Sequence, residues 1–141
     1  MPRFLVPVDG SETSLRAVDQ LLKKLQWYKE PVDIHVLNVQ YPLHGDVSMF
    51  VGKDQIRDFH HDEGLKALAS TREKLDARGV KYVHHIAIGD PAQVIAQYAR
   101  EQKVDQVFMG TRGLGSVAGL IMGSVAAKVI HLCEVPVLLV K

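Results

Sequence analysis

The sequence predicts an α/β protein built on one parallel sheet. Short apolar runs alternate with segments of helical spacing along the whole chain, an order that favours parallel strands joined by right-handed crossovers. The length of 141 residues suits a single domain over residues 1–141, large enough to bury a substantial core. Glycine-containing turns follow the first and the fourth of the five expected strands, at the edge where parallel sheets bind ligands.

The first half of the chain is expected to hold two strands and two helices. Residues 4–8 and 33–39 are the strands, and residues 40–54 are irregular. The second helix spans residues 55–78, with Gly79 as its C′ residue. The expected apolar faces are Leu15, Val18, Leu22 and Leu25 in the first helix, and Ile56, Phe59, Leu65, Leu68 and Leu75 in the second.

The second half repeats the alternation. A strand over residues 82–88 precedes a helix with Asp90 as N-cap, Pro91 at N1 and Gln93 at N3, a variant of the capping box. Its expected apolar face is Val94, Ile95, Tyr98 and Ala99. The remaining elements are a strand over residues 106–109, a helix over residues 125–133 and a strand over residues 137–140.

Composition narrows the partners and the compartment. With 47% hydrophobic residues, 23% charged residues and a formal net charge of +1, the chain has no bulk attraction for nucleic acid or anionic membranes, and we expect neither partner. No apolar run approaches the roughly 20 residues that span a bilayer, and no signal-peptide pattern opens the chain. The single cysteine, Cys133, excludes an internal disulfide and is expected to be buried. We therefore expect a cytoplasmic protein.

Pro7 is unusual because it lies within a strand expected inside the sheet. Proline has no N–H for the ladder, so it is tolerated near a strand end, where pairing fades and a ligand can lie against it. Open parallel sheets bind ligands outside the carboxyl ends of their strands, where the strand order reverses. We therefore expect Asp9 and the glycine segment that starts at Gly110 to meet across one crevice.

That glycine segment predicts a phosphate site. The chain reads Gly110-Thr111-Arg112-Gly113, then nine residues, then Gly123-Ser124. Glycines let the backbone approach a ligand closely, and a helix that opens at Gly123 presents unpaired N–H groups and the positive end of its dipole. Arg112 is able to pair with phosphate oxygens, and Ser124 to offer its hydroxyl and N–H.

Each of these features also has a purely structural interpretation. Asp9 either accepts hydrogen bonds from ribose or adenine or, like Ser11, caps the first helix. The glycines after residue 109 either cradle phosphate or form a flexible loop, and Gly123 is alternatively a tight helix–strand contact. Arg112 is equally well explained as an exposed loop residue, and Ser124 as an N-cap.

Other motifs for phosphate, metal or catalysis are not convincing. There is no G-x-x-x-x-G-K-[ST] sequence, and the G-x-G-x-x-A match at residues 113–118 lacks an acidic residue at the end of a following strand. The histidine pairs at 60–61 and 84–85 diverge on a helix or a strand, so no metal is expected. Without a G-x-S-x-G elbow or a Ser/His/Asp triad, no catalytic residue is predicted.

Taken together, these residues resemble the ATP-binding signature of the universal stress protein family. The glycine spacing matches that signature, residues 5–11 are similar to the family's first strand and turn, and residues 135–140 to its last strand. The resemblance covers essentially the whole chain. It implies a doubly wound sheet of five strands in the order 3-2-1-4-5, and a homodimer through the C-terminal strand Val137–Val140, whose apolar edge suits pairing.

The resemblance also assigns roles within the crevice. Residues matching Pro7, Asp9 and Val39 line the adenosine pocket in nucleotide-binding members. A second set holds ribose and phosphates, and its members match Met109, Gly110, Gly113, Gly123, Ser124 and Val125. Ala126 departs from the hydroxyl residue that some ATP binders carry. The complete set of candidate binding residues is Pro7, Val8, Asp9, Val39, Met109, Gly110, Arg112, Gly113, Gly123, Ser124 and Val125.

We therefore predict a protein that binds ATP, ADP or AMP and acts as a sensor or regulator in the stress response. Mg²⁺ is expected only together with nucleotide, held through water by Asp9. No general base or nucleophile is evident, so at most slow ATP hydrolysis is expected. Two alternatives stay open: a slow ATPase whose occupancy is a switch, and a dimeric interaction module that binds no nucleotide.

Overall fold

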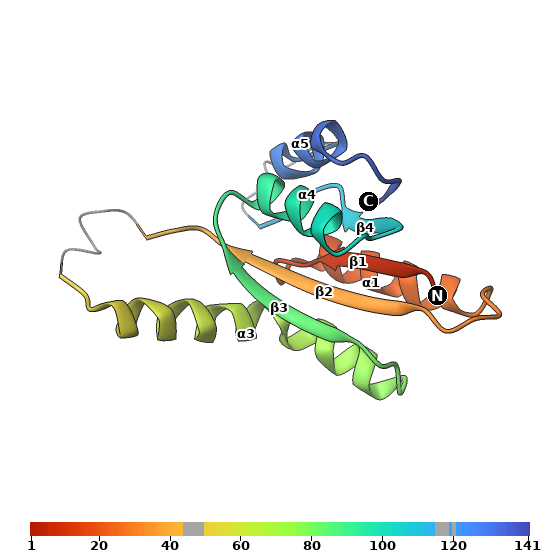
Figure 1. Ribbon diagram of the computed structural model, residues 1–141, viewed down its shortest axis with the longest axis horizontal. Coiled ribbons are helices and arrows are strands. Elements are labelled where there is room, and N and C mark those ends of the chain that lie inside the picture. Colours follow the sequence, from red (N-terminus) through yellow and green to blue (C-terminus); the bar gives the residue numbers. More distant parts are fainter. Residues whose placement is uncertain (44–49, 115–118, 120) are drawn as a thin grey trace.

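The computed structural model describes residues 1–43, 50–114, 119 and 121–141, and it confirms the predicted fold class. The described strands are parallel and lie in the order β3-β2-β1-β4-β5 (Figure 1). They are β1 (Arg3–Pro7), β2 (Asp33–Gln40), β3 (Val83–Ile88), β4 (Gln106–Gly110) and β5 (Val137–Val140). The described helices are α1 (Glu12–Leu25), α3 (Lys53–Ala77), α4 (Pro91–Glu101) and α5 (Ser124–Leu132).

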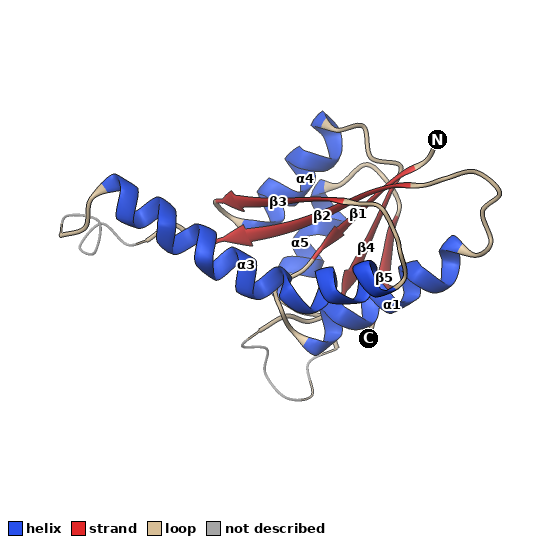
Figure 2. Ribbon diagram, turned by 90° about the horizontal axis from the view of Figure 1, so that it is seen from below, coloured by secondary structure: helices blue, strands red, loops and turns tan. Residues whose placement is uncertain are grey.

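Two layers of helices bury the sheet. Helices α1 and α3 cover one face, and α4 and α5 cover the other (Figure 2). Each face has its own apolar cluster, because strand side chains alternate between the two sides. The first includes Phe4, Val6, Val18, Leu21, Val36, Leu68, Leu75 and Phe108. The second includes Leu5, Leu37, Ala92, Ile95, Ala99, Val107, Met109 and Val129.

Helix boundaries follow the predicted capping signals. Ser11 caps α1, since its side chain accepts a hydrogen bond from Ser14 N at 3.2 Å. Asp90 caps α4 in the same way through Gln93 N, also at 3.2 Å, and Pro91 is the first helical residue. Gly79 follows the end of α3 with φ +65°, the left-handed conformation expected of a C′ glycine. The local chemistry of these turns is therefore enough to end and begin the helices.

One residue of the predicted apolar face of α3 is wrong. Phe59 was expected to be buried in α3, but its side chain is 46% exposed and the neighbouring His60 is only 3% exposed. The amino-terminal part of this 25-residue helix extends beyond the sheet (Figures 1 and 2), so the core covers only part of its length. Leu68 and Leu75, further along the helix, are fully buried as predicted.

Two expectations fall partly outside the described residues: the irregular segment 40–54, which includes Gly45, and the motif match at residues 113–118.

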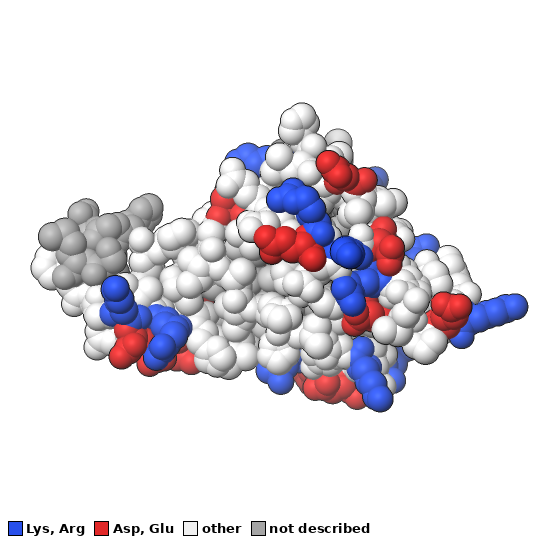
Figure 3. All heavy atoms as spheres, viewed as in Figure 1, with Lys and Arg blue, Asp and Glu red and all other residues white. Residues whose placement is uncertain are grey.

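Charges of both signs are interspersed over the face in Figure 3, without a broad patch of one sign. Within the described parts of the chain, no helix is both long and apolar enough to cross a membrane.

Candidate functional site

The candidate site lies where β1 and β4 separate. The β1–β2 ladder continues to the pair Pro7↔Leu37, but the β1–β4 ladder has only the pairs Phe4↔Gln106 and Leu5↔Val107. From β1 the chain proceeds to β2 and β3 on one side, and β4 and β5 lie on the other, so the strand order reverses here. This is the place where open parallel sheets bind ligands.

Pro7 occupies the last position of β1, one residue earlier than the predicted strand end at Val8. Val8 donates its amide to Leu37 O at 2.8 Å, toward β2. Because main-chain groups of successive strand residues face alternate neighbours, the missing N–H of Pro7 faces β4, where the ladder has already ended. The proline therefore disrupts no pairing.

A cavity of about 580 Å³ opens at this edge of the sheet. All of the predicted binding residues line it: Pro7, Val8, Asp9, Val39, Met109, Gly110, Arg112, Gly113, Gly123, Ser124 and Val125. The fold thus brings four separate chain segments to one place. Their role toward a ligand stays a prediction.

Asp9 is a clamp between two of these segments. Its Oδ1 accepts the amide of Ser11 at 2.9 Å, and its Oδ2 accepts the amide of Leu114 at 2.8 Å. The second bond fixes the loop after β4 against the loop after β1. A Cβ atom at Gly113 would collide with Asp9 Oδ2, so this close approach requires glycine at position 113.

The start of α5 differs from the starts of α1 and α4. Its N-cap is Gly123, which supplies no side-chain hydrogen bond, and Ser124 is the first helical residue rather than the N-cap. Gly123 N donates to Thr111 O at 2.6 Å, so this predicted phosphate-binding amide is engaged within the protein. The first-turn amides from Ser124 onward are the ones that helix geometry leaves without intrahelical partners. These amides adjoin the cavity.

Sequence reasoning missed the walls that the helices supply. Apolar Pro91 and Ile95 come from α4, whereas Glu63 and Lys66, joined by an ion pair of 3.2 Å, come from α3. Nothing local in the sequence connects these residues with the glycine segment, because helix packing alone brings them to the cavity. Thr111 also lines it, and its buried Oγ1 has no hydrogen-bond partner in the described structure.

Asn38 is the missed residue that carried a signal. It interrupts the apolar run of residues 36–39 within β2, and it is only 2% exposed. Its Nδ2 donates to Val8 O at 2.9 Å, and its Oδ1 accepts from Gln40 Nε2 at 2.7 Å. A buried amide is expected to have such partners, so an asparagine at this position indicates a polar feature inside the core.

Most residues set aside as non-functional are half-buried or exposed, but His60 is buried and its Nδ1 has no hydrogen-bond partner in the described structure. Cys133 is half-buried rather than fully buried, because it caps the end of α5 beside the edge strand, and burial raises the pKa of its thiol. His61, His84 and His85 are exposed. Within the described residues, no group of three or more potential ligands is arranged to hold a metal ion.

The model of the universal stress protein family matches residues 1–141. This chain belongs to that family. Universal stress protein YxiE of Bacillus subtilis is 31% identical over 147 residues, covering 99% of this chain and 98% of the relative. The resemblance in the glycine spacing and in the terminal strands is thereby confirmed.

Solved structures of universal stress proteins share the whole fold. The protein MJ0577 of Methanocaldococcus jannaschii has a TM-score of 0.84 at 26% identity, covering 99% of this chain and 95% of the other. A universal stress protein solved in complex with cAMP has a TM-score of 0.69 at 28% identity, covering 99% and 97%.

Proposed function

We propose that this universal stress protein binds an adenine nucleotide in the crevice at the carboxyl end of its sheet and acts as a cytoplasmic sensor or regulator in the stress response. The uncapped amino terminus of α5, which adjoins the cavity, is the observation that carries the proposal. A related universal stress protein, solved with cAMP, supports the class of ligand.

The phosphates would lie at the start of α5. The amides of the first helical turn and the helix dipole both favour a negative charge there. Arg112, which lines the same cavity, adds a positive charge, and Ser124 adds a hydroxyl. The Thr111 hydroxyl, buried and without a partner in the described structure, fits a polar ligand or its water.

The base would lie at the opposite side of the cavity, against β2. Pro91, Ile95 and Met109 supply apolar surface for a planar ring. Leu37 O accepts from Val8 N, so alternation along β2 directs the N–H and C=O of Val39 toward β1 as well. At that level β1 has ended, and a donor beside an acceptor complements the N1 acceptor and 6-amino donor of adenine.

The acidic side chains that line the cavity support binding rather than fast turnover. Asp9 accepts two main-chain amides, and Glu63 pairs with Lys66. Neither is placed as an unengaged general base, whose proton transfer requires direct reach to the attacking water. Mg²⁺ would then accompany the nucleotide, with Asp9 holding it through water.

Titration calorimetry with ATP, ADP, AMP and cAMP tests the proposal, together with mass spectrometry of any nucleotide that co-purifies. We expect saturable binding of at least one adenine nucleotide, with GTP much weaker. Tripolyphosphate is the control for the phosphate end alone. If neither adenine nucleotides nor tripolyphosphate bind at millimolar concentration, the proposal is wrong.

The edge strand β5 supports a homodimer as part of the same proposal. It is the last strand of the sheet, and its four residues Val137–Val140 are apolar and half-buried. Unpaired strand edges of this kind favour pairing with a second chain. Light scattering after size-exclusion chromatography should give twice the chain mass at micromolar concentration, and a monomer there would contradict this assembly.

A further inference from the structure

We propose that Asn38 and Gln40 are positioning residues for base recognition, because they stop the β1–β2 ladder one rung early and thereby open the main-chain edge of Val39. This inference rests on the proposed nucleotide site. It adds the device that makes the site selective for adenine.

The ladder geometry identifies the missing rung. The pair Pro7↔Leu37 and the bond from Val8 N to Leu37 O are the last rungs between β1 and β2. In a parallel ladder the next bond would run from Val39 N to Val8 O. Val8 O instead accepts the side-chain Nδ2 of Asn38 at 2.9 Å, in a buried bond.

The orientation of both side-chain amides follows from this one contact. A carbonyl oxygen only accepts, so Asn38 must direct its NH₂ group to Val8 and its Oδ1 away from it. Gln40 must then donate Nε2 to that Oδ1, which it does at 2.7 Å. Gln40 O in turn accepts from Gly89 N at 2.9 Å, which fixes the residue against the loop after β3.

The two hydrogen bonds of Asn38, to Val8 O and from Gln40, form a relay that has a chemical consequence at the neighbouring residue Val39. With Val8 O occupied, the N–H of Val39 is left to a ligand, beside the C=O of the same residue. Adenine offers N1 as an acceptor and its 6-amino group as a donor, which matches this edge. Hypoxanthine and guanine carry the reverse pattern, an N1–H donor and an O6 acceptor. In the same position their N1–H would face the N–H of Val39, and their O6 would face its C=O.

The substitution Asn38→Leu tests the relay. We expect Val8 O to take the Val39 N–H, so that ATP binds about tenfold or more weakly and the preference for ATP over ITP approaches one. Tripolyphosphate, which has no base, should bind within about twofold of wild type. Gln40→Leu should weaken ATP by about threefold to fivefold. Gln26→Leu, at an exposed position after α1, is the matched control and should change nothing.

Hydrogen exchange of the Val39 amide, followed by NMR, tests directly whether the bond from Val39 N to Val8 O is formed. In the wild-type protein without nucleotide this amide should exchange quickly and become protected when ATP is added. In Asn38→Leu it should be protected without nucleotide. If Asn38→Leu does not fold, Gln40→Leu carries the same comparison with a smaller change.

Two results would overturn the inference while nucleotide binding stands. One is a Val39 amide already protected in the wild-type protein without nucleotide. The other is full discrimination between ATP and ITP in both variants. If the wild-type protein binds neither ATP nor tripolyphosphate, the proposed function is refuted, and this inference with it.

Discussion

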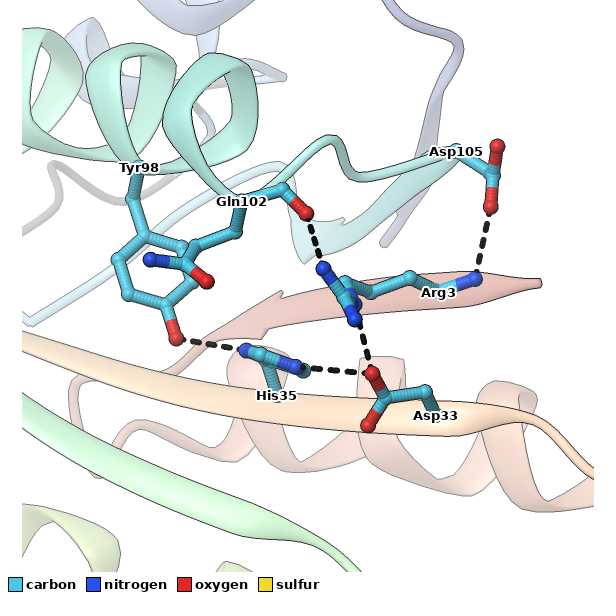
Figure 4. A network of polar contacts seen from close by, with 6 residues as sticks. All are labelled: Arg3, Asp33, His35, Tyr98, Gln102 and Asp105. Carbon is cyan, nitrogen blue, oxygen red and sulfur yellow. Dashed lines mark hydrogen bonds and ion pairs between the residues drawn. The ribbon is translucent and has the colours of Figure 1, made fainter. Parts of the chain in front are cut away.

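The two ends of the sheet treat their polar groups in opposite ways. At the carboxyl end, Val39 and the first residues of α5 line a cavity, and the first-turn amides of α5 have no intrahelical partners. At the amino end, side-chain and main-chain polar groups of β1, β2, α4 and the segment before β4 bond to one another (Figure 4). On the proposed function one end receives a ligand, whereas the polar groups of the other end bond within the protein.

Arg3 and His35 organise the closed end. Arg3 Nε donates to Asp33 Oδ2 at 2.6 Å, and the main-chain amide of Arg3 donates to Asp105 Oδ2 at 2.8 Å. His35 is buried, with Nδ1 at 2.6 Å from Tyr98 Oη and Nε2 at 3.3 Å from Asp33 Oδ2. Figure 4 shows these side chains turned toward one another across β1, β2 and α4.

Under the proposed function, this difference means that one sheet separates binding from stability along the direction of its strands. Polar groups that satisfy one another stabilise the fold, whereas groups held ready for a ligand contribute little until it binds. Substitutions at the carboxyl end should therefore change affinity, and those at the amino end should change the free energy of unfolding.

The largest expected effect is on binding, from Gly113→Ala. The new Cβ atom would collide with Asp9 Oδ2, so it would push apart the two loops that Asp9 joins as well as weaken the bond from Leu114 N, and nucleotide affinity should fall about 10- to 30-fold. Calorimetry with ATP measures it. Gly52→Ala is the control, because the nearest atom to its new Cβ would be Gln55 Oε1 at 4.0 Å. Unchanged affinity in Gly113→Ala would remove the distinction between the two ends.

Asp9→Ala should have the next largest effect. It removes the acceptor for the amides of Ser11 and Leu114, so we expect about tenfold weaker binding and a loss of about 1–3 kcal/mol in unfolding free energy. Asp9→Asn keeps only one acceptor oxygen and should be intermediate. Urea unfolding and calorimetry on the same samples separate the two effects. A loss of stability alone would mean that the clamp serves the fold and not the ligand.

Arg3→Ala tests the closed end. Its guanidinium is partly exposed, so the loss of its bonds to Asp33 and Gln102 O should lower the unfolding free energy by only about 1–2 kcal/mol. Nucleotide affinity should stay within about twofold of wild type, since the cavity is at the other end. Arg100→Ala, at an exposed position in α4, is the matched control. A large change in affinity would show that the two ends are coupled.

The smallest expected effect is a pH dependence at Asp33. Burial raises the pKa of this carboxyl, but hydrogen bonds from Arg3 and His35 and their positive charge outweigh it and hold the pKa below its ordinary value of 3.8. Its stabilising contribution should thus be complete above that value and be lost as the pH falls through the lower folded-state pKa.

Urea unfolding of wild type and Asp33→Asn from neutral to acid pH measures this contribution. The variant should be less stable at neutral pH, and the two curves should converge in acid. Asp58→Asn, at an exposed position in α3, is the control and should run parallel to wild type. Curves that stay parallel for Asp33→Asn would contradict the lowered pKa.

Much of the fold could be predicted because its signals are local. The caps at Ser11 and Asp90 and the left-handed Gly79 depend on neighbouring residues only, and each is as expected. The exposure of Phe59 could not be predicted, because periodicity does not reveal where a long helix extends past the sheet it covers. The same limit hid Lys66 and Ile95 from the candidate site, since they reach the cavity through packing.

The glycine spacing, the strand-terminal Pro7 and the alternation of apolar runs were sufficient by themselves to determine the family, the order of elements and the edge of the sheet at which to look. These features set the local backbone conformation, and that conformation depends mainly on residues that are neighbours in the sequence. Only the tertiary structure decided that Gly123 N bonds within the protein, that Asp9 joins two loops, and that Asn38 takes the carbonyl of Val8. Such pairings depend on which distant donors and acceptors meet, and that is fixed only when the strands and helices have packed together.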